Sequence, residues 1–327
     1  LKEATAKGSH DYTNVHYTIL GRIVESVTGM SWKDYLQQRI FDQAGMTRTT
    51  CYAGRLYGDA DAAMPTVLKN DAFVSADIRK TDRTMHAAGG SGTSAREAAR
   101  WIEVQLADGQ LDGVELDAEA VRSMRERNSD KEPDGSIRRL DGFGLGWMLG
   151  TYRGRPYVTH GGGYVGTAAH FSFLPEEGLG VVVLANGSPS GQAFVTIASI
   201  DVYDRLLGEE GHKDLLPAYV RTIAEEPAAP RGRRGLAAGD LPLAPELCAG
   251  EFGSDHWGVL SLAVQDGELR GAFGDLVVDL EPLDDERFRL SSSAGQELEG
   301  EFVVEAERVR AIRLTGDGYS IELSAAE

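Results

Sequence analysis

The sequence predicts an α+β protein in which an antiparallel sheet flanked by helices, together with a helical region, precedes a small all-β, barrel-like domain. Amphipathic helical patterns come first in the chain, and four β-prone segments with one further helix follow them. From residue 246 onward, short alternating runs recur about every ten residues. We therefore expect a mixed domain over 1–207, a linker over 208–245 and a β domain over 246–327.

Composition excludes several classes of partner. Hydrophobic residues make up 42% and charged residues 26% of the 327 residues, which is ordinary for a globular protein. The formal net charge of −18 argues against nucleic acid and anionic membrane surfaces. No run of about 18 apolar residues occurs, so we expect no transmembrane segment. Cys51 and Cys248 do not form a disulfide framework, and their redox state stays open.

Three helices are predicted in the first hundred residues. Apolar residues recur at helical spacing after residue 14, and Gly29 stands where a helix-ending glycine belongs. Ser31 begins a second helix with Asp34 as its capping-box partner, and Ser94 with Glu97 does the same for a third. The inner face of the first helix is expected to consist of Tyr17, Leu20, Ile23, Val24 and Val27.

A sheet is predicted after a long irregular connection over 52–86 and a short helix that begins at Asp117. Irregular loops of that length are usually functional. A hairpin turn over 175–178 joins the last two strands, and the apolar run 181–184 indicates a central strand covered by the helix 190–207. The four expected strands are 143–151, 155–160, 166–174 and 179–185.

The stretch His160-Gly161-Gly162-Gly163 is the strongest candidate for chemistry. A short strand is expected to end at His160, and the glycines that follow leave room for another molecule beside it. Backbone N–H groups of Gly162 and Gly163 can stabilise a developing oxyanion. The alternative is structural, since three glycines also suit a bulge or a hairpin corner.

The sequence lacks the motifs of several other reaction classes. The sequence contains no His-Glu-x-x-His, no Cys-x-x-Cys, no Gly-x-Gly-x-x-Gly opening a helix and no Gly-x-Ser-x-Gly, so we expect no metal and no cofactor. What remains is the pairing of Tyr12-Thr13-Asn14, just before a helix, with the His160 stretch. Taken alone, Tyr12 is also a packing residue and Asn14 also a helix N-cap.

These motifs, in this order, resemble the serine β-lactamase and penicillin-binding-protein superfamily, specifically the class C β-lactamase-like branch of esterases and D-aminopeptidases. Tyr12-Thr13-Asn14 and the helix after it resemble the Tyr-x-Asn motif of that branch. The match covers about residues 9–207, and 246–327 is similar to the lipocalin-like β domain appended to such hydrolases. The other matching segments are Ile40-Phe41 through Gly45-Met46-Thr47, Ala88-Gly89-Gly90 with the Ser94 helix, Gly144-Leu145-Gly146-Trp147, and His160-Gly161-Gly162 in the place of Lys-Thr-Gly.

The resemblance implies a role for each matching residue in acyl transfer to a serine followed by hydrolysis. Tyr12 would be the general base, and Asn14 would contact the substrate and hold the catalytic network. His160 would polarise Tyr12 or bind the polar end of the substrate, next to Gly161 and Gly162. The N–H of Gly163 would form half of the oxyanion hole. The implied substrate is a small ester, amide or peptide.

Two departures qualify these roles. The nucleophile of the family lies in Ser-x-x-Lys, and no serine in this sequence has lysine three residues later. We therefore expect a second polypeptide to carry it, most simply the N-terminal part of the same precursor. Histidine at position 160, in place of lysine, favours esterases and D-aminopeptidases over β-lactamases. The alternative to an enzyme is a non-catalytic relative that keeps the pocket as a binding module.

Two further expectations concern what surrounds this chain. Leu1-Lys-Glu-Ala-Thr is neither a signal peptide nor a methionine start, so the chain is expected to be processed. A periplasmic or secreted location is suggested by the resemblance alone. With about four strands and one covering helix, one face of the sheet should stay open, as should the inner stripes of the helices at 15–28 and 94–107.

Overall fold

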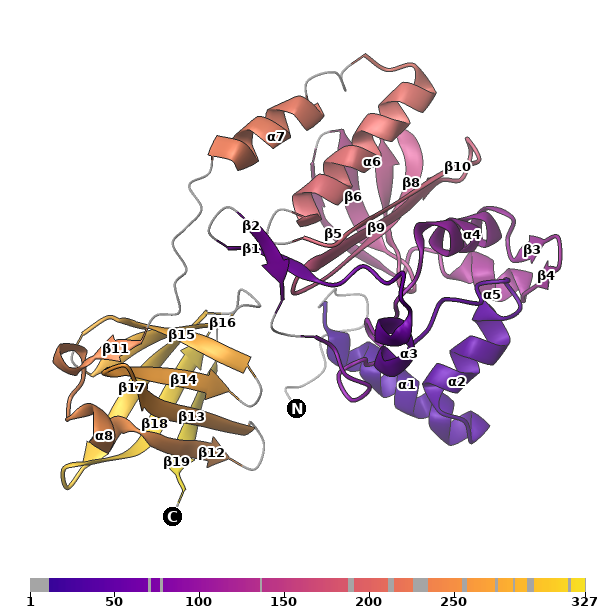
Figure 1. Ribbon diagram of the computed structural model, residues 1–327. Coiled ribbons are helices and arrows are strands. Elements are labelled where there is room, and N and C mark those ends of the chain that lie inside the picture. The colour runs from indigo at the N-terminus through magenta and orange to yellow at the C-terminus, as the bar shows by residue number, and fades with distance from the viewer. Residues whose placement is uncertain are drawn as a thin grey trace. The chain divides into compact units, whose positions relative to one another are not determined.

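The computed structural model divides the chain into two compact units (Figure 1). The first comprises residues 1–68 and 73–227, and the second comprises 69–72 and 228–327. The structure describes residues 12–69, 72–76, 79–135, 137–187, 191–210, 215–225, 235–254, 258–273, 276–284, 286–292, 297–316 and 319–326.

The first unit is built on a six-stranded antiparallel sheet in which every strand pairs with its neighbour in sequence. The spatial order is β10-β9-β8-β7-β6-β5. The strands are β5 (Ser129–Asp134), β6 (Arg138–Phe143), β7 (Met148–Tyr152), β8 (Arg155–Tyr164), β9 (Thr167–Leu174) and β10 (Leu179–Ala185).

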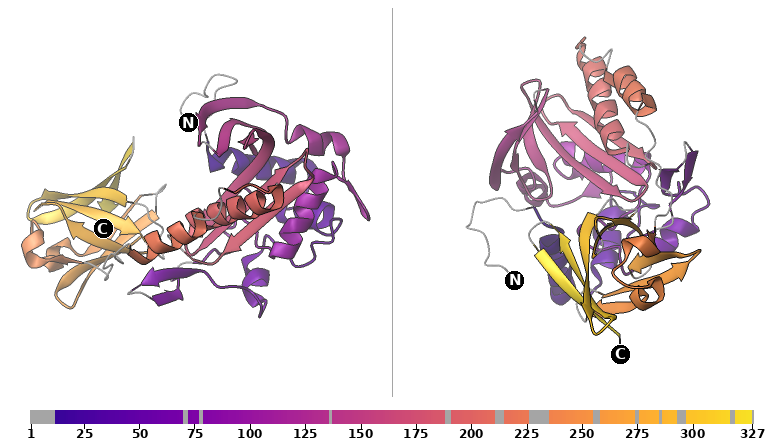
Figure 2. Two further views of the ribbon diagram at one scale, coloured as in Figure 1. Left: turned by 90° about the horizontal axis from the view of Figure 1, so that it is seen from above. Right: turned by 90° about the vertical axis from the view of Figure 1, so that its left-hand side faces the viewer.

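Helices cover both faces of this sheet (Figure 2). Helix α6 (Gly191–Leu207) packs on one face, where Tyr157, Leu174 and Val181 join its Tyr203 in one buried cluster. Helix α4 (Ala95–Leu106) packs on the other, where Val158 and Phe173 contact its Ile102. Successive strand residues point to opposite faces, so β7, β8, β9 and β10 each supply both clusters. The expected open face is therefore wrong, and so is the expected open stripe on the helix at 94–107.

The position of β10 also differs from expectation. The run Val181–Leu184 predicted a central strand, whereas β10 lies at the edge of the sheet among the described strands. Its apolar character on both faces has another cause, because α4 and α6 both contact it. A strand that helices cover on both faces needs apolar residues throughout, at the edge of a sheet as well as in its centre.

The predicted caps at Ser31 and Ser94 are confirmed. Ser31 caps α2 (Trp32–Leu36) and Ser94 caps α4, each by accepting a backbone N–H, and Thr13, which was not predicted as a cap, does the same for α1 (Asn14–Thr28). The connection predicted to be irregular over 52–86 instead contains a short helix and a two-stranded hairpin. The remaining elements of this unit are η1 (Gln37–Phe41, a π-helical turn), α3 (Ala53–Gly58), β1 (Thr66–Lys69), β2 (Ala72–Ser75), β3 (Gln110–Leu111), β4 (Val114–Glu115), α5 (Ala118–Ser123) and α7 (Leu215–Glu225).

Two strand boundaries differ from the prediction near the candidate motif. Residues 144–147 form the turn between β6 and β7, so 143–151 is not one strand. Gly146 takes a left-handed conformation there (φ 82°), which favours glycine. Strand β8 does not end at His160 but continues to Tyr164, and its three glycines pair with β9.

The second unit is a closed barrel of eight antiparallel strands. Each strand pairs with the next, and the last pairs with the first to close the barrel. Phe252, Leu280, Phe288, Ile312 and Leu323 are among the buried side chains that fill its interior. The strands are β12 (Gly250–Ser254), β13 (Gly258–Gln265), β14 (Glu268–Phe273), β15 (Leu276–Pro282), β16 (Arg287–Ser292), β17 (Glu297–Glu305), β18 (Arg308–Gly316) and β19 (Tyr319–Ala325).

The segment 208–245, expected to be a linker, carries structure at both ends. Helix α7 lies within it and packs against α6 in the first unit. Leu236 and Leu241 are buried in the core of the second unit, which therefore begins before residue 246. The segment contains β11 (Leu236–Ala237) and η2 (Ala238–Asp240), and α8 (Pro245–Cys248) follows. No helix in the described part of the chain is long and apolar enough to cross a membrane.

A buried polar cluster fixes α6 to the sheet. Asp204, fully buried on α6, accepts hydrogen bonds from the Tyr152 hydroxyl at 2.5 Å and from two guanidinium nitrogens of Arg153 at 2.7 Å. Further along the same face, the Tyr157 hydroxyl lies 3.1 Å from Nε2 of His170. These contacts join β7, β8, β9 and α6 through groups that would be costly to leave unpaired.

Removing the Asp204 carboxylate tests the first part of this cluster. Asp204→Ala takes the carboxylate from the Arg153 guanidinium and leaves the Tyr152 hydroxyl with the Ile200 carbonyl at 3.2 Å, so we expect the free energy of unfolding to fall by about 3–5 kcal/mol. Asp201→Ala, one turn earlier on the same helix, removes only a pairing with the exposed Arg205 and should cost less than about 1 kcal/mol. Urea unfolding followed by tryptophan fluorescence measures both. Equal losses in the two variants would contradict the structural role of Asp204.

His170 makes stability depend on pH. Burial, and secondarily the charge of Arg138, lower the pKa of His170 to about 4 from 6.5. Between these values the unfolded chain binds the proton and the folded chain does not, so the free energy of unfolding falls as the pH falls. We expect a loss of about 3 kcal/mol between pH 6.5 and 4 from this residue. His170→Gln should lack that loss, and His16→Gln, at an exposed position, should keep it.

Candidate functional site

Tyr12 and His160 meet although 148 residues separate them in the chain. Tyr12 stands just before α1 and His160 lies in β8, and their rings stack with centroids 6.3 Å apart and planes 30° from parallel. The Tyr12 side chain is 59% exposed, so it is not a buried packing residue. The structure thus brings two of the sequence-predicted site residues together at the open end of α1.

Asn14 lies at the same helix end but does not cap it. The side-chain oxygen of Thr13 accepts the N–H of Val15 at 3.2 Å, so Thr13 is the N-cap and Asn14 is the first helical residue. Asn14 is exposed, and its carbonyl accepts the hydroxyl of Thr18. The reading of Asn14 as a structural cap is therefore wrong, and its amide stands in solvent two residues after Tyr12.

A backbone contact defines the tautomer of His160. Nδ1 lies 2.5 Å from the carbonyl oxygen of Gly161. A carbonyl can only accept, so Nδ1 carries a proton in this contact, and in the neutral ring the lone pair is then on Nε2. A neutral imidazole held this way accepts a proton or a hydrogen bond at Nε2. That is the property required of a group that polarises a hydroxyl.

The glycines divide between the two faces of the sheet. A side chain at Gly161 or Gly163 would meet Gln192 of α6, at 3.3 and 3.2 Å. Gly162 therefore lies on the other face with His160, because alternate residues of a strand share a face. Gly162 and Gly163 are both exposed. The surface beside Tyr12 is thus a strip of strand without side chains, open to a second molecule.

One edge of this strip has unpaired backbone groups in the described structure. Strand β7 begins at Met148, which pairs with Thr159. From His160 to Tyr164, β8 pairs with β9 alone among the described strands. In an antiparallel sheet alternate residues direct N–H and C=O to each side, so this edge offers both to an extended ligand.

The sequence prediction missed the neighbours of this strip. Tyr17 lies in contact range of the turn at Gly146, and burial raises its pKa. At the far end, Lys80 stands over the ring of Tyr164, with Nζ 4.9 Å from the ring centroid. The period of two from His160 through Gly162 predicts that Tyr164 shares their face. Nothing local in the sequence places Lys80 beside it.

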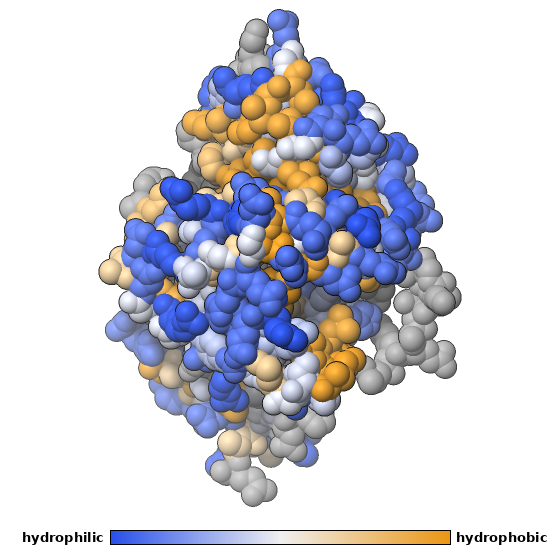
Figure 3. Space-filling view, turned by 90° about the vertical axis from the view of Figure 1, so that its right-hand side faces the viewer, coloured by the Kyte–Doolittle hydropathy of each residue, from blue (hydrophilic) through white to orange (hydrophobic). Residues whose placement is uncertain are grey.

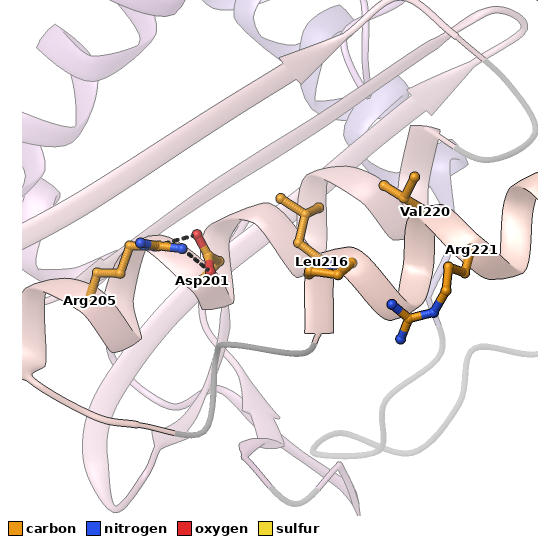
Figure 4. Close-up of a pocket in the computed structure, with 6 residues that line it drawn as sticks. Asp201, Arg205, Leu216, Val220 and Arg221 are labelled. Atoms are coloured by element: carbon orange, nitrogen blue, oxygen red, sulfur yellow. Dashed lines mark hydrogen bonds and ion pairs between the residues drawn. The ribbon is translucent and has the colours of Figure 1, made fainter.

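Pockets elsewhere in the first unit do not contain these residues. A hollow of about 510 Å³ between α6 and α7 is lined by Asp201, Arg205 and Arg221 with apolar residues of α7 (Figure 4). Arg205 is already paired with Asp201 there. A second, more apolar hollow is lined by Phe73, Phe194 and neighbouring residues. Neither includes Tyr12 or His160, so we assign the candidate site to the strip.

Two known proteins are similar to this chain in sequence. The chain is 27% identical over 228 residues to penicillin-binding protein 4 of Amycolatopsis lactamdurans, covering 67% of this chain and 56% of that protein. It is 24% identical over 298 residues to the unguisins hydrolase ungD of Aspergillus violaceofuscus, covering 81% of this chain and 52% of that protein. The chain thus spans about half the length of the curated relatives it matches.

A solved structure shares the fold. The octameric penicillin-binding protein homologue from Pyrococcus abyssi superposes with a TM-score of 0.56 at 21% identity, over 99% of this chain and 67% of that one. The model of the beta-lactamase family matches residues 3–202, which include α1, α4, the whole sheet and most of α6. The chain therefore belongs to the beta-lactamase family, within the superfamily that also contains the penicillin-binding proteins.

Proposed function

We propose that this protein is a serine hydrolase that forms an acyl-enzyme with small esters, amides or peptides. The contact between Tyr12 and His160 is the observation that carries the proposal, because it sets a phenol beside an imidazole whose Nδ1 is held by the Gly161 carbonyl. Two relatives named a penicillin-binding protein and a hydrolase support the reaction class. The esterase and D-aminopeptidase-like specificities belong to the same proposal.

The residues divide the reaction as follows. Tyr12, in its phenolate form, takes the proton of a serine hydroxyl while the serine oxygen bonds to the substrate carbonyl carbon. The N–H of Gly163 receives the oxyanion. The bond to the leaving group then breaks, and that group departs with the proton from Tyr12. Tyr12 then takes a proton from water, whose oxygen bonds to the acyl carbon. The bond from that carbon to the serine oxygen breaks, the acid leaves, and Tyr12 returns the proton to the serine oxygen. His160 orients Tyr12, and Asn14 holds the substrate.

The serine and its lysine partner come from a second stretch of polypeptide in this proposal. The sequence lacks Ser-x-x-Lys, while α1 exposes Leu20, Ile23 and Val27, the last by 79%. An apolar helix face of this extent normally packs against another chain segment. Strand β10 adds an apolar edge, and Figure 3 shows hydrophobic residues gathered on the side of the molecule that it views. A strand of the same partner fits that edge.

A second candidate function follows from the same absence. Without Ser-x-x-Lys the strip can still bind ligands through its open edge, as a non-catalytic binding module. We favour the enzyme because Tyr12 meets His160 beside the exposed glycine strip, with Asn14 two residues after Tyr12 in the chain. In either case we propose that the eight-stranded barrel is a lipocalin-like accessory domain, since its interior is filled by apolar side chains.

Replacing the Tyr12 hydroxyl tests the general base. In the protein completed with its Ser-x-x-Lys segment, Tyr12→Phe should lower turnover of an aryl ester by about two to four orders of magnitude. Stability should change little, because the side chain is exposed. Tyr35→Phe, on α2, is the matched control and should retain activity within about threefold. Near-wild-type turnover in Tyr12→Phe would remove Tyr12 from the mechanism.

Labelling with a fluorophosphonate decides between enzyme and binding module. We expect the protein isolated from its source to acquire one label per active site, on a serine followed three residues later by lysine. Mass spectrometry of the native and the denatured sample should then show that the labelled stretch is held against this chain. Separating the two should abolish labelling, and recombination should restore it. A protein that binds ester analogues but never becomes acylated would establish the binding module instead.

A further inference from the structure

Two cationic side chains lie over aromatic rings near the C-terminal end of β8. Nζ of Lys80 lies 4.9 Å from the centroid of Tyr164, the last residue of the strand. The guanidinium carbon of Arg79 lies 5.9 Å from the ring centroid of Tyr57. The two rings are close enough that Tyr57, after burial, contributes to raising the pKa of Tyr164. Four residues from three segments therefore form one positively charged cluster.

This cluster faces the same way as the candidate site. His160, Gly162 and Tyr164 alternate along β8 and share the face opposite α6, as the contacts of Gly161 and Gly163 with Gln192 show. One strand residue rises about 3.3 Å, so Tyr164 lies about 13 Å along the strand from His160 and one residue beyond Gly163. A substrate whose carbonyl meets the N–H of Gly163 lies one residue from Tyr164, over whose ring Lys80 stands.

The charge of Lys80 is incompletely compensated. Its ammonium donates to the carbonyl oxygen of Gly89 at 2.7 Å and contacts the Tyr164 ring. Within the ranges that the structure describes, no carboxylate forms a salt bridge with Lys80 or Arg79. Burial lowers the pKa of Lys80, which reflects the cost of keeping an ammonium away from water. An arriving carboxylate supplies a counter-charge and a hydrogen-bond acceptor in addition to the Gly89 carbonyl.

We propose that Lys80 is a specificity-determining residue that binds a carboxylate of the substrate, so that the preferred esters or amides carry an anionic group near the reacting carbonyl. Arg79 reinforces the local positive charge. The inference rests on the proposed function for the reaction, but the anion site itself needs no nucleophile. Lys80 comes from the loop before α4 and supplies a cation, which the histidine at position 160 does not provide.

Three anilides of similar size test the proposal by binding alone. N-phenylglutaramate carries its carboxylate on the acyl side, 4-butyramidobenzoate carries it on the amine side, and butyranilide is neutral. We would measure the dissociation constant of each with the 327-residue chain by calorimetry or ligand-observed NMR. At least one anion should bind about tenfold more tightly than butyranilide, the size of a hydrogen bond to a charged group. The preferred anion identifies which side of the substrate faces Lys80.

Three variants assign the preference to Lys80. Lys80→Gln should reduce the ratio between the anion and butyranilide to about one, while butyranilide binding stays unchanged. Lys80→Arg should keep most of the ratio, because it keeps the charge. Arg83→Gln removes one positive charge from an exposed position of the same loop and should keep the ratio in full. Circular dichroism checks that each variant is folded. If Lys80→Gln unfolds, the wild-type protein is measured at 0.5 M NaCl instead, where the ratio between the anion and butyranilide should be lost.

The outcomes separate this inference from the proposed function. An equal ratio in wild type and Lys80→Gln, or no preference for either anion, overturns the anion site whatever the protein does to esters. A Lys80-dependent preference in a protein that a fluorophosphonate never labels keeps the anion site and overturns the hydrolase. Turnover should follow binding in the complete enzyme: Lys80→Gln should raise KM for the anionic ester about tenfold and leave kcat nearly unchanged.

Discussion

Strand β8 has to satisfy two demands that conflict in most strands. Its first half is buried between two helices, with Tyr157 facing α6 and Val158 facing α4. Its second half must stay paired with β9 and yet leave room for a second molecule beside His160. Three glycines meet both demands. A glycine keeps its backbone pairing with the neighbouring strand, and because it has no side chain it leaves the surface of the sheet uncovered. The candidate site is therefore a continuation of the core strand.

The rest of the first unit holds this strand in place. Asp204 ties α6 to β7 through Tyr152 and Arg153, and His170 pairs with Tyr157 on the same face. On the opposite face, the turn at Gly146 receives Tyr17 and so positions α1, whose first residues bring Tyr12 to His160. The geometry of the site thus depends on buried polar contacts several residues away from it. Such contacts act through position and never touch a ligand.

Local signals in the sequence were reliable where the physics is local. The caps at Ser31 and Ser94 were predicted because a hydroxyl and the N–H three residues later lie within one turn. The predictions failed where contacts between segments distant in sequence decide the structure. The run Val181–Leu184 indicated a central strand, although burial by α4 and α6 produces the same apolar pattern at a sheet edge. The boundary at 246 came too late, because Leu236 and Leu241 reach the barrel core from a segment that is polar overall.

The sequence by itself determined the α+β class, the glycine strip after His160 and the motif residues Tyr12 and Asn14, since each depends on residue type and short-range spacing. Only the tertiary structure decided that Tyr12 meets His160, that Thr13 rather than Asn14 caps α1, and that Lys80 stands at the end of the strip. The physical reason is the same in each case. Contacts across 148 or 84 residues are set by how helices and loops pack on the sheet, and hydrophobic periodicity carries no information about which partner a side chain meets.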